Sequence, residues 1–62
     1  MKSSELIRML EENGWTLDRI KSSHRTFKHP DFASLITVPH PKKDIKPGTL
    51  GQILRKAGLK QN

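Results

Sequence analysis

Three histidines carry the candidate chemistry of this sequence of 62 residues, which contains no cysteine. An imidazole changes its protonation near neutral pH and therefore suits general acid–base catalysis. His24 and His29 are five positions apart, so a regular strand turns them to opposite faces, and we expect no metal site. Ser22 and Ser23 lie too close to His24 along the chain for a defined nucleophile–base pair, which argues against a serine triad.

A lone exposed histidine suits the cleavage of RNA. The ribose 2′-OH supplies the nucleophile, so His24 needs only to take a proton from it or to give one to the leaving 5′-oxygen, while cations stabilise the phosphorane charge. If Phe27 points into the core, the two-residue period of a strand turns His24 outward. The alternative for His24 is a polar strand residue after a turn. His29 precedes Pro30 on the Phe27 side, where a local hydrogen bond is its expected role.

The positive charge is concentrated in the C-terminal two thirds of the chain. Residues 1–18 have two bases against four acids, whereas residues 19–62 have ten bases against two acids, and the formal total is +6. Such a region favours a polyanionic partner, although a solvated basic surface or an acidic protein partner also fits this charge. We expect phosphate contacts from Ser23, Lys28, His40, Lys42, Lys43 and Lys46.

Five segments must position these side chains. Ser3 or Ser4 is expected to cap a first helix that runs to about Asn13, where Asn13-Gly14 stops it. The strands expected next cover residues 15–21, 24–29 and 35–38. Pro47 suits the first position of a second helix, and Gly58 suits its C-terminal cap. The apolar stripe of this helix consists of Leu50, Ile53, Leu54 and Ala57.

This order predicts an α+β fold, αβββα, with a three-stranded antiparallel sheet and both helices on one face. We expect a single domain over residues 1–62, because a chain this short has room for one core and no ordinary cofactor cavity. The apolar stretches are only a few residues long, so we expect no membrane contact and a cytoplasmic location.

Several segments together resemble the HicA toxins, the YcfA-like mRNA interferases of type II toxin–antitoxin systems. The resemblance covers nearly the whole chain and rests on the order and spacing of residues 13–15, 22–24, 27–30, 37–40, 46–50 and 53–59. It implies a fold like that of double-stranded-RNA-binding domains. The family has a Gly-Ser-His motif whose histidine maps to His24, while Ser22 stands where glycine is usual. A positive φ there would strain Ser22 by about 1 kcal/mol or more.

The resemblance also implies an activity and a partner. It implies a metal-independent, cofactor-free endoribonuclease that cleaves mRNA and arrests translation, with His24 as the general acid or base. It implies a HicB-type antitoxin that masks His24, so that DNA is contacted only indirectly, through the antitoxin. The alternative is a non-catalytic RNA-binding module of the same fold.

Overall fold

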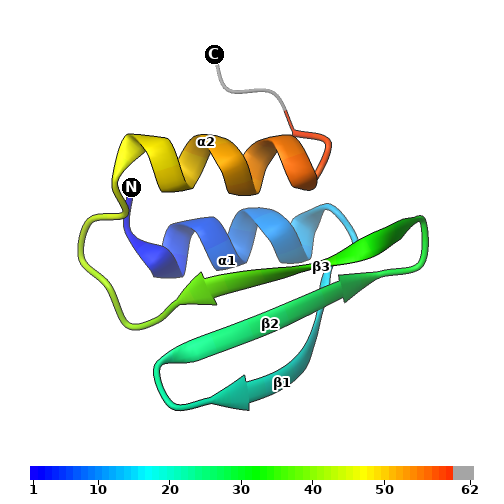
Figure 1. Ribbon diagram of the computed structural model, residues 1–62, viewed down its shortest axis with the longest axis horizontal. Coiled ribbons are helices and arrows are strands. Elements are labelled where there is room, and N and C mark those ends of the chain that lie inside the picture. Colours follow the sequence, from blue (N-terminus) through cyan, green and yellow to red (C-terminus); the bar gives the residue numbers. More distant parts are fainter. Residues whose placement is uncertain (60–62) are drawn as a thin grey trace.

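The computed structural model describes residues 1–59, which form two helices and one sheet (Figure 1). The elements follow the expected α+β order, and strand β2 lies in the middle of an antiparallel sheet with the order β1-β2-β3. The elements are α1 (Ser3–Glu12), β1 (Thr16–Lys21), β2 (His24–His29), β3 (Phe32–Pro39) and α2 (Pro47–Lys56).

The helices begin and end largely where backbone chemistry requires. Gly14 after α1 and Gly58 after α2 have positive φ angles of 94° and 71°, which glycine adopts without steric cost. Pro47 occupies the start of α2, as expected. The expected serine cap of α1 is wrong: Lys2 is the N-cap and no side chain caps the helix, because Ser3 is already helical and its hydroxyl is bonded elsewhere.

Two strand boundaries differ from the expectation. Strand β1 begins at Thr16, because the Trp15 N–H donates to the Leu10 carbonyl of α1 and the ladder with β2 starts at the pair Thr16–Lys28. Strand β3 begins at Phe32, three residues earlier than expected, because the two residues after His29 form a tight turn and Phe32 pairs directly with His29. The β2–β3 hairpin is therefore longer than its apolar residues alone indicated.

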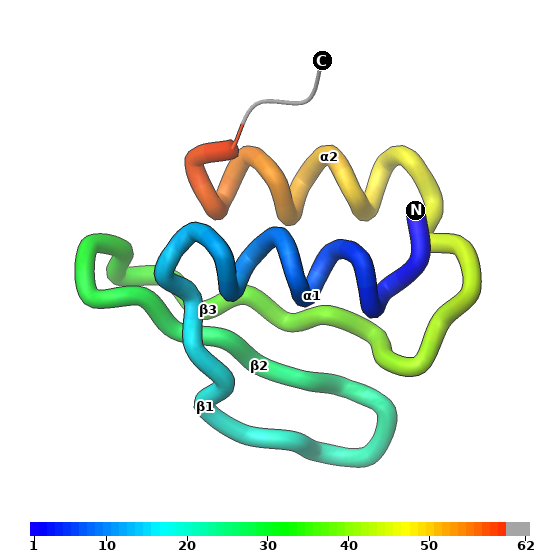
Figure 2. The backbone as a smooth tube through the Cα atoms, turned by 180° about the vertical axis from the view of Figure 1, so that it is seen from behind, coloured from blue at the N-terminus to red at the C-terminus, as the bar shows by residue number. Residues whose placement is uncertain are grey.

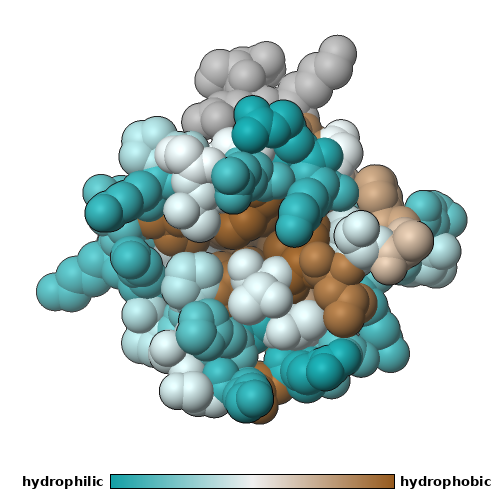
Figure 3. Space-filling model, viewed as in Figure 1, coloured by the Kyte–Doolittle hydropathy of each residue, from teal (hydrophilic) through white to brown (hydrophobic). Residues whose placement is uncertain are grey.

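Both helices cover the same face of the sheet, as Figures 1 and 2 show from opposite sides. They pack mainly on β3, and the core between the layers contains residues from α1, β2, β3, α2 and the connecting segments. All six residues of β1 are exposed. In Figure 3 apolar surface appears in patches between hydrophilic side chains. The core residues are Leu6, Leu10, Trp15, Phe27, Ile36, Val38, Ile45, Leu50, Ile53, Leu54 and Ala57.

The helices are also short. Each has ten residues, about 15 Å of helix, and within residues 1–59 none is long and apolar enough to cross a bilayer.

Candidate functional site

The three histidines differ in how many ring nitrogens the fold already uses. His29 uses both: its Nδ1 accepts from the Asp31 N–H at 3.0 Å, so its Nε2 carries the proton and donates to the Asn13 carbonyl at 3.0 Å. Its ring also lies 5.1 Å from that of Trp15 and 4.9 Å from that of Phe32. His29 therefore has the local structural role that its position before Pro30 indicated.

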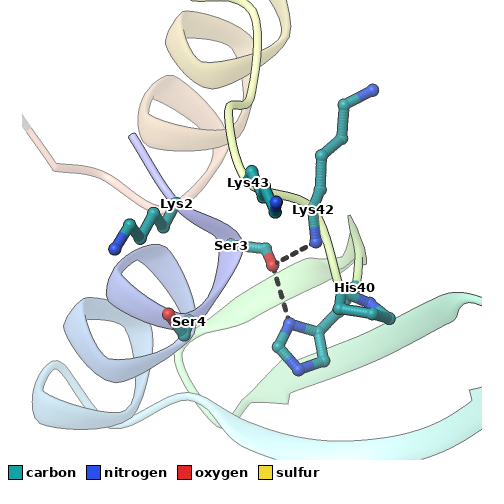
Figure 4. Close-up of a pocket in the computed structure, with 7 residues that line it drawn as sticks. Lys2, Ser3, Ser4, His40, Lys42 and Lys43 are labelled. Carbon is teal, nitrogen blue, oxygen red and sulfur yellow. Dashed lines mark hydrogen bonds between the residues drawn. The ribbon is translucent and has the colours of Figure 1, made fainter.

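His40 uses one ring nitrogen. Its Nδ1 lies 2.7 Å from the hydroxyl of Ser3, and that hydroxyl also accepts from the Lys42 N–H at 2.9 Å (Figure 4). The Ser3 N–H in turn donates to the Lys42 carbonyl at 2.9 Å. The start of α1 thus holds the imidazole, which is partly buried, and leaves its Nε2 without a protein partner among residues 1–59.

His24 uses neither ring nitrogen within the part of the chain that the structure describes. It is the first residue of β2 and is exposed. Phe27 is buried under the helices together with its partner Ile36, so the alternate residues of the two strands face away from the helices. The hydroxyls of Thr26 and Thr37, 3.4 Å apart, lie on this open face. His24 thus projects from the open face, as Phe27 led us to expect.

Strand β1 adds two cations to the open face that the sequence analysis did not select. Lys21 pairs with His24, and Arg19 pairs with Thr26, so both residues share its side of the sheet. Directly paired residues have Cβ atoms about 5 Å apart, which places Lys21 beside the imidazole. The sequence alone indicates that Arg19 and Lys21, on either side of Ile20, share one face of the strand. Only the register of β1 against β2 shows that this face is the one that bears His24.

The residues selected as phosphate contacts do not form one cluster. His40, Lys42 and Lys43 line an open hollow of about 630 Å³, and Ser23 adjoins it because its carbonyl accepts from the His40 N–H at 2.7 Å. Lys28, by contrast, forms an ion pair of 3.7 Å with Asp18. Lys46 is the N-cap of α2 and does not line the hollow.

The hollow includes residues that the sequence analysis did not assign to a site. Lys2, Ser3 and Ser4 line it from the start of α1 (Figure 4). Ser3 is only 1% exposed and is bonded to residues 37 and 39 positions away. Within residues 1–59 no three His, Asp or Glu side chains come together as a metal-binding group.

The turn between β1 and β2 holds Ser22, the residue that stands where glycine is usual, at a positive φ angle. Ser22 has a φ of 56°, while Ser23 has no positive φ. A positive φ at the first loop residue alone is the sign pattern of a type II′ hairpin turn, which favours glycine there. The pairing of Lys21 with His24 is nevertheless intact, so the strained serine leaves His24 on the open face.

Fold and site together define a small basic α+β protein that presents a histidine and cations on an open sheet face. The family described as "HicA toxin of bacterial toxin-antitoxin" matches residues 3–59, so the chain belongs to the HicA toxin family. A solved chain titled "HicA3 and HicB3 toxin-antitoxin complex" is 41% identical, with a TM-score of 0.86 and 100% of both chains covered. The search of curated proteins found no match. The resemblance drawn from the sequence is thereby confirmed.

Proposed function

We propose that this chain is a ribonuclease toxin that cleaves mRNA, with His24 as its general acid or base. The observation that carries the proposal is that His24, in a HicA-family chain, is the histidine whose two ring nitrogens have no protein partner among residues 1–59. It stands on an open face where a phosphodiester can approach. His29 is fully bonded within the fold, so it has no nitrogen left for proton transfer.

The proposed reaction uses the nucleophile that RNA provides. The 2′-oxygen forms a bond to the adjacent phosphorus and the bond from phosphorus to the 5′-oxygen breaks, which leaves a 2′,3′-cyclic phosphate and a 5′-hydroxyl. One proton leaves the 2′-OH and one reaches the 5′-oxygen. His24 transfers the proton at one of these oxygens and water transfers it at the other. The reaction itself requires no metal ion and no cofactor.

Lys21 and Arg19 are the cations best placed to stabilise the phosphorane. Lys21 is the cross-strand partner of His24, and Arg19 follows on the same face. Their charges act where negative charge develops on the phosphate oxygens. Arg19 also contacts Asp18 at 3.0 Å, but that exposed ion pair is solvent-screened and leaves Lys21 as the nearer cation.

A HicB-type antitoxin is the proposed protein partner of the chain. The similar solved chain is titled as part of a HicA3–HicB3 complex. An acidic antitoxin surface would compete with RNA for the cations around His24 and mask the histidine. Contact with DNA would then be indirect, through the antitoxin. A toxin that acts on mRNA is expected in the cytoplasm.

Purified protein incubated with RNA in EDTA tests the proposal. We expect cleavage by the unaltered chain, 2′,3′-cyclic phosphate ends, and no cleavage where the 2′-OH is replaced by hydrogen. His24→Ala should lose at least about 10²-fold of the rate and keep its circular dichroism spectrum, because the side chain is exposed. Gln52→Ala, exposed on α2, is the matched control and should cleave normally.

Two results separate the proposal from its alternatives. RNA binding without cleavage products would identify a non-catalytic RNA-binding module instead. Undiminished cleavage by His24→Ala would remove the histidine from the mechanism. In cells, expression should arrest growth, and co-expression of the antitoxin should relieve the arrest.

A further inference from the structure

The hollow beside His40 has the construction of an anion site and has no part in the proposed proton transfer. Three lysines, Lys2, Lys42 and Lys43, line it together with Ser3, Ser4 and His40 (Figure 4). Among the described residues 1–59, no acidic residue lines it. The nearby acid Asp44 is directed to the Met1 amine, at 3.1 Å.

The hydrogen bonds of Ser3 determine what His40 offers to a ligand. The Ser3 hydroxyl is buried, and its oxygen already accepts from the Lys42 N–H. If Nδ1 of His40 donated to this oxygen, the hydroxyl proton would be left in a buried site without an acceptor, which costs about 1–3 kcal/mol. The favoured arrangement is therefore that Ser3 donates to Nδ1, and the remaining proton of the neutral ring lies on Nε2. His40 then presents a donor at Nε2, and a protonated ring presents the same donor.

A fixed imidazole donor among lysines is suited to an oxygen anion. Nε2–H supplies a directed hydrogen bond, and the ammonium groups supply charge on flexible stems. A cation would be repelled here, and a neutral His40 with its proton on Nε2 has no free lone pair to bind a metal ion. The chemistry of the lining therefore selects a phosphate or carboxylate oxygen.

The hollow lies at the same end of the sheet as His24. Pro39 is the strand partner of His24, and the next residue, His40, bonds the carbonyl of Ser23 through its N–H. Strand alternation places the His40 side chain with Val38 on the helix side, opposite the face that bears His24. An RNA strand whose scissile phosphate lies at His24 thus reaches the hollow by passing round this end of β2 and β3.

We propose that the hollow binds a second, non-scissile phosphodiester of the RNA substrate, held by Nε2–H of His40 and by Lys42 and Lys43. This inference rests on the proposed ribonuclease function and adds a subsite to it. Ser3 is a positioning residue, because it acts only through His40.

Two substitutions of His40 isolate the Nε2 donor. The amide of His40→Asn can still meet the Ser3 hydroxyl in place of Nδ1 but has no group at Nε2, whereas the longer His40→Gln places an amide nitrogen near Nε2. Both are made in His24→Ala protein, so that a short single-stranded RNA is bound and not cut, and affinity is read by fluorescence anisotropy. We expect His40→Asn to weaken binding severalfold and His40→Gln to restore most of the loss.

The lysines are tested by salt dependence in the same His24→Ala protein. Lys42→Met with Lys43→Met removes charge but keeps the stems, and should weaken RNA binding about tenfold. It should also lower the slope of log K against log salt by about 0.7, the value for one phosphate on a single strand. The matched control is Arg55→Met with Lys56→Met, which removes two cations from the last turn of α2. It should leave the RNA affinity and the salt slope unchanged.

Inorganic phosphate provides a readout that is independent of RNA cleavage. In ¹⁵N-resolved NMR spectra, neutral His40 should have its proton on Nε2, and phosphate should shift its signals and those of Lys42 and Lys43. The double substitution Lys42→Met with Lys43→Met could weaken RNA binding while the unaltered protein cuts no RNA. In that case the subsite stands and the ribonuclease proposal fails. Equal RNA affinity in all variants, or a loss confined to antitoxin binding, would overturn the subsite even if cleavage is normal.

Discussion

Replacing Ser22 by glycine should stabilise the fold, because Ser22 holds a left-handed backbone at a φ of 56°. A non-glycine residue in that region costs roughly 1–2 kcal/mol. Glycine removes this strain but loses about 0.5–1 kcal/mol through its greater freedom in the unfolded chain. At the midpoints of these two ranges, the net expected gain is about 0.75 kcal/mol in the free energy of unfolding. For a domain of this size, that is a rise in Tm of roughly 3–6 °C.

Ser23→Gly is the matched control for this prediction. It changes the neighbouring residue of the same turn, where no positive φ is present to be relieved, so it should lower the free energy of unfolding by about 0.5–1 kcal/mol. Urea denaturation followed by circular dichroism measures both variants. Opposite signs for the two variants are expected. A Ser22→Gly protein no more stable than the parent would refute the reasoning about the turn, and a changed cleavage rate would show that the turn also aims His24.

Three further substitutions test the packing and the hollow. Gly14→Ala should destabilise the protein by about 2 kcal/mol or more, because φ is +94° and a Cβ would lie 2.7 Å from Nε2 of His29. Gly48→Ala, in α2 with nothing within 4 Å, should instead stabilise it by about 0.4–1 kcal/mol in thermal unfolding. Ser3→Ala should cost about 1–3 kcal/mol in urea unfolding, because it leaves buried partners unpaired; a loss below about 0.5 kcal/mol would contradict the hydrogen-bond assignment. Ile36→Ala should cost about 2–5 kcal/mol and Ile20→Ala far less, because Ile36 is buried and Ile20 is 55% exposed; equal losses would show that β1 is covered in solution.

The order of elements was predictable because local signals agree along the chain. The apolar stripe of Leu50, Ile53 and Leu54 has helical spacing, and Gly14 and Gly58 end the two helices. Each signal lies within a few residues of the boundary that it sets. The outward direction of His24 was likewise accessible, because it follows from the strand period once Phe27 is buried.

The composition of the hollow was not predictable from the sequence, because it depends on distant contacts. A serine before an amphipathic helix usually indicates a cap, yet the Ser3 hydroxyl bonds His40 and the Lys42 N–H across more than 35 residues. Charge alone placed Lys28 and Lys46 with the other lysines. Lys28 is four residues from His24 along β2, about 13 Å on an extended strand, and the structure pairs it with Asp18.

The uncovered position of β1 has a consequence for motion. No residue of β1 belongs to the core, so its attachment depends on the ladder with β2, without helix packing behind it. Segments with few buried apolar contacts open at a lower free energy than the core, and their amide protons exchange sooner. We therefore expect the strand that carries Lys21 and Arg19 to open more readily than β2, which carries His24. In the ribonuclease proposed above, these cations would adjust to different RNA backbones while His24 stays in place.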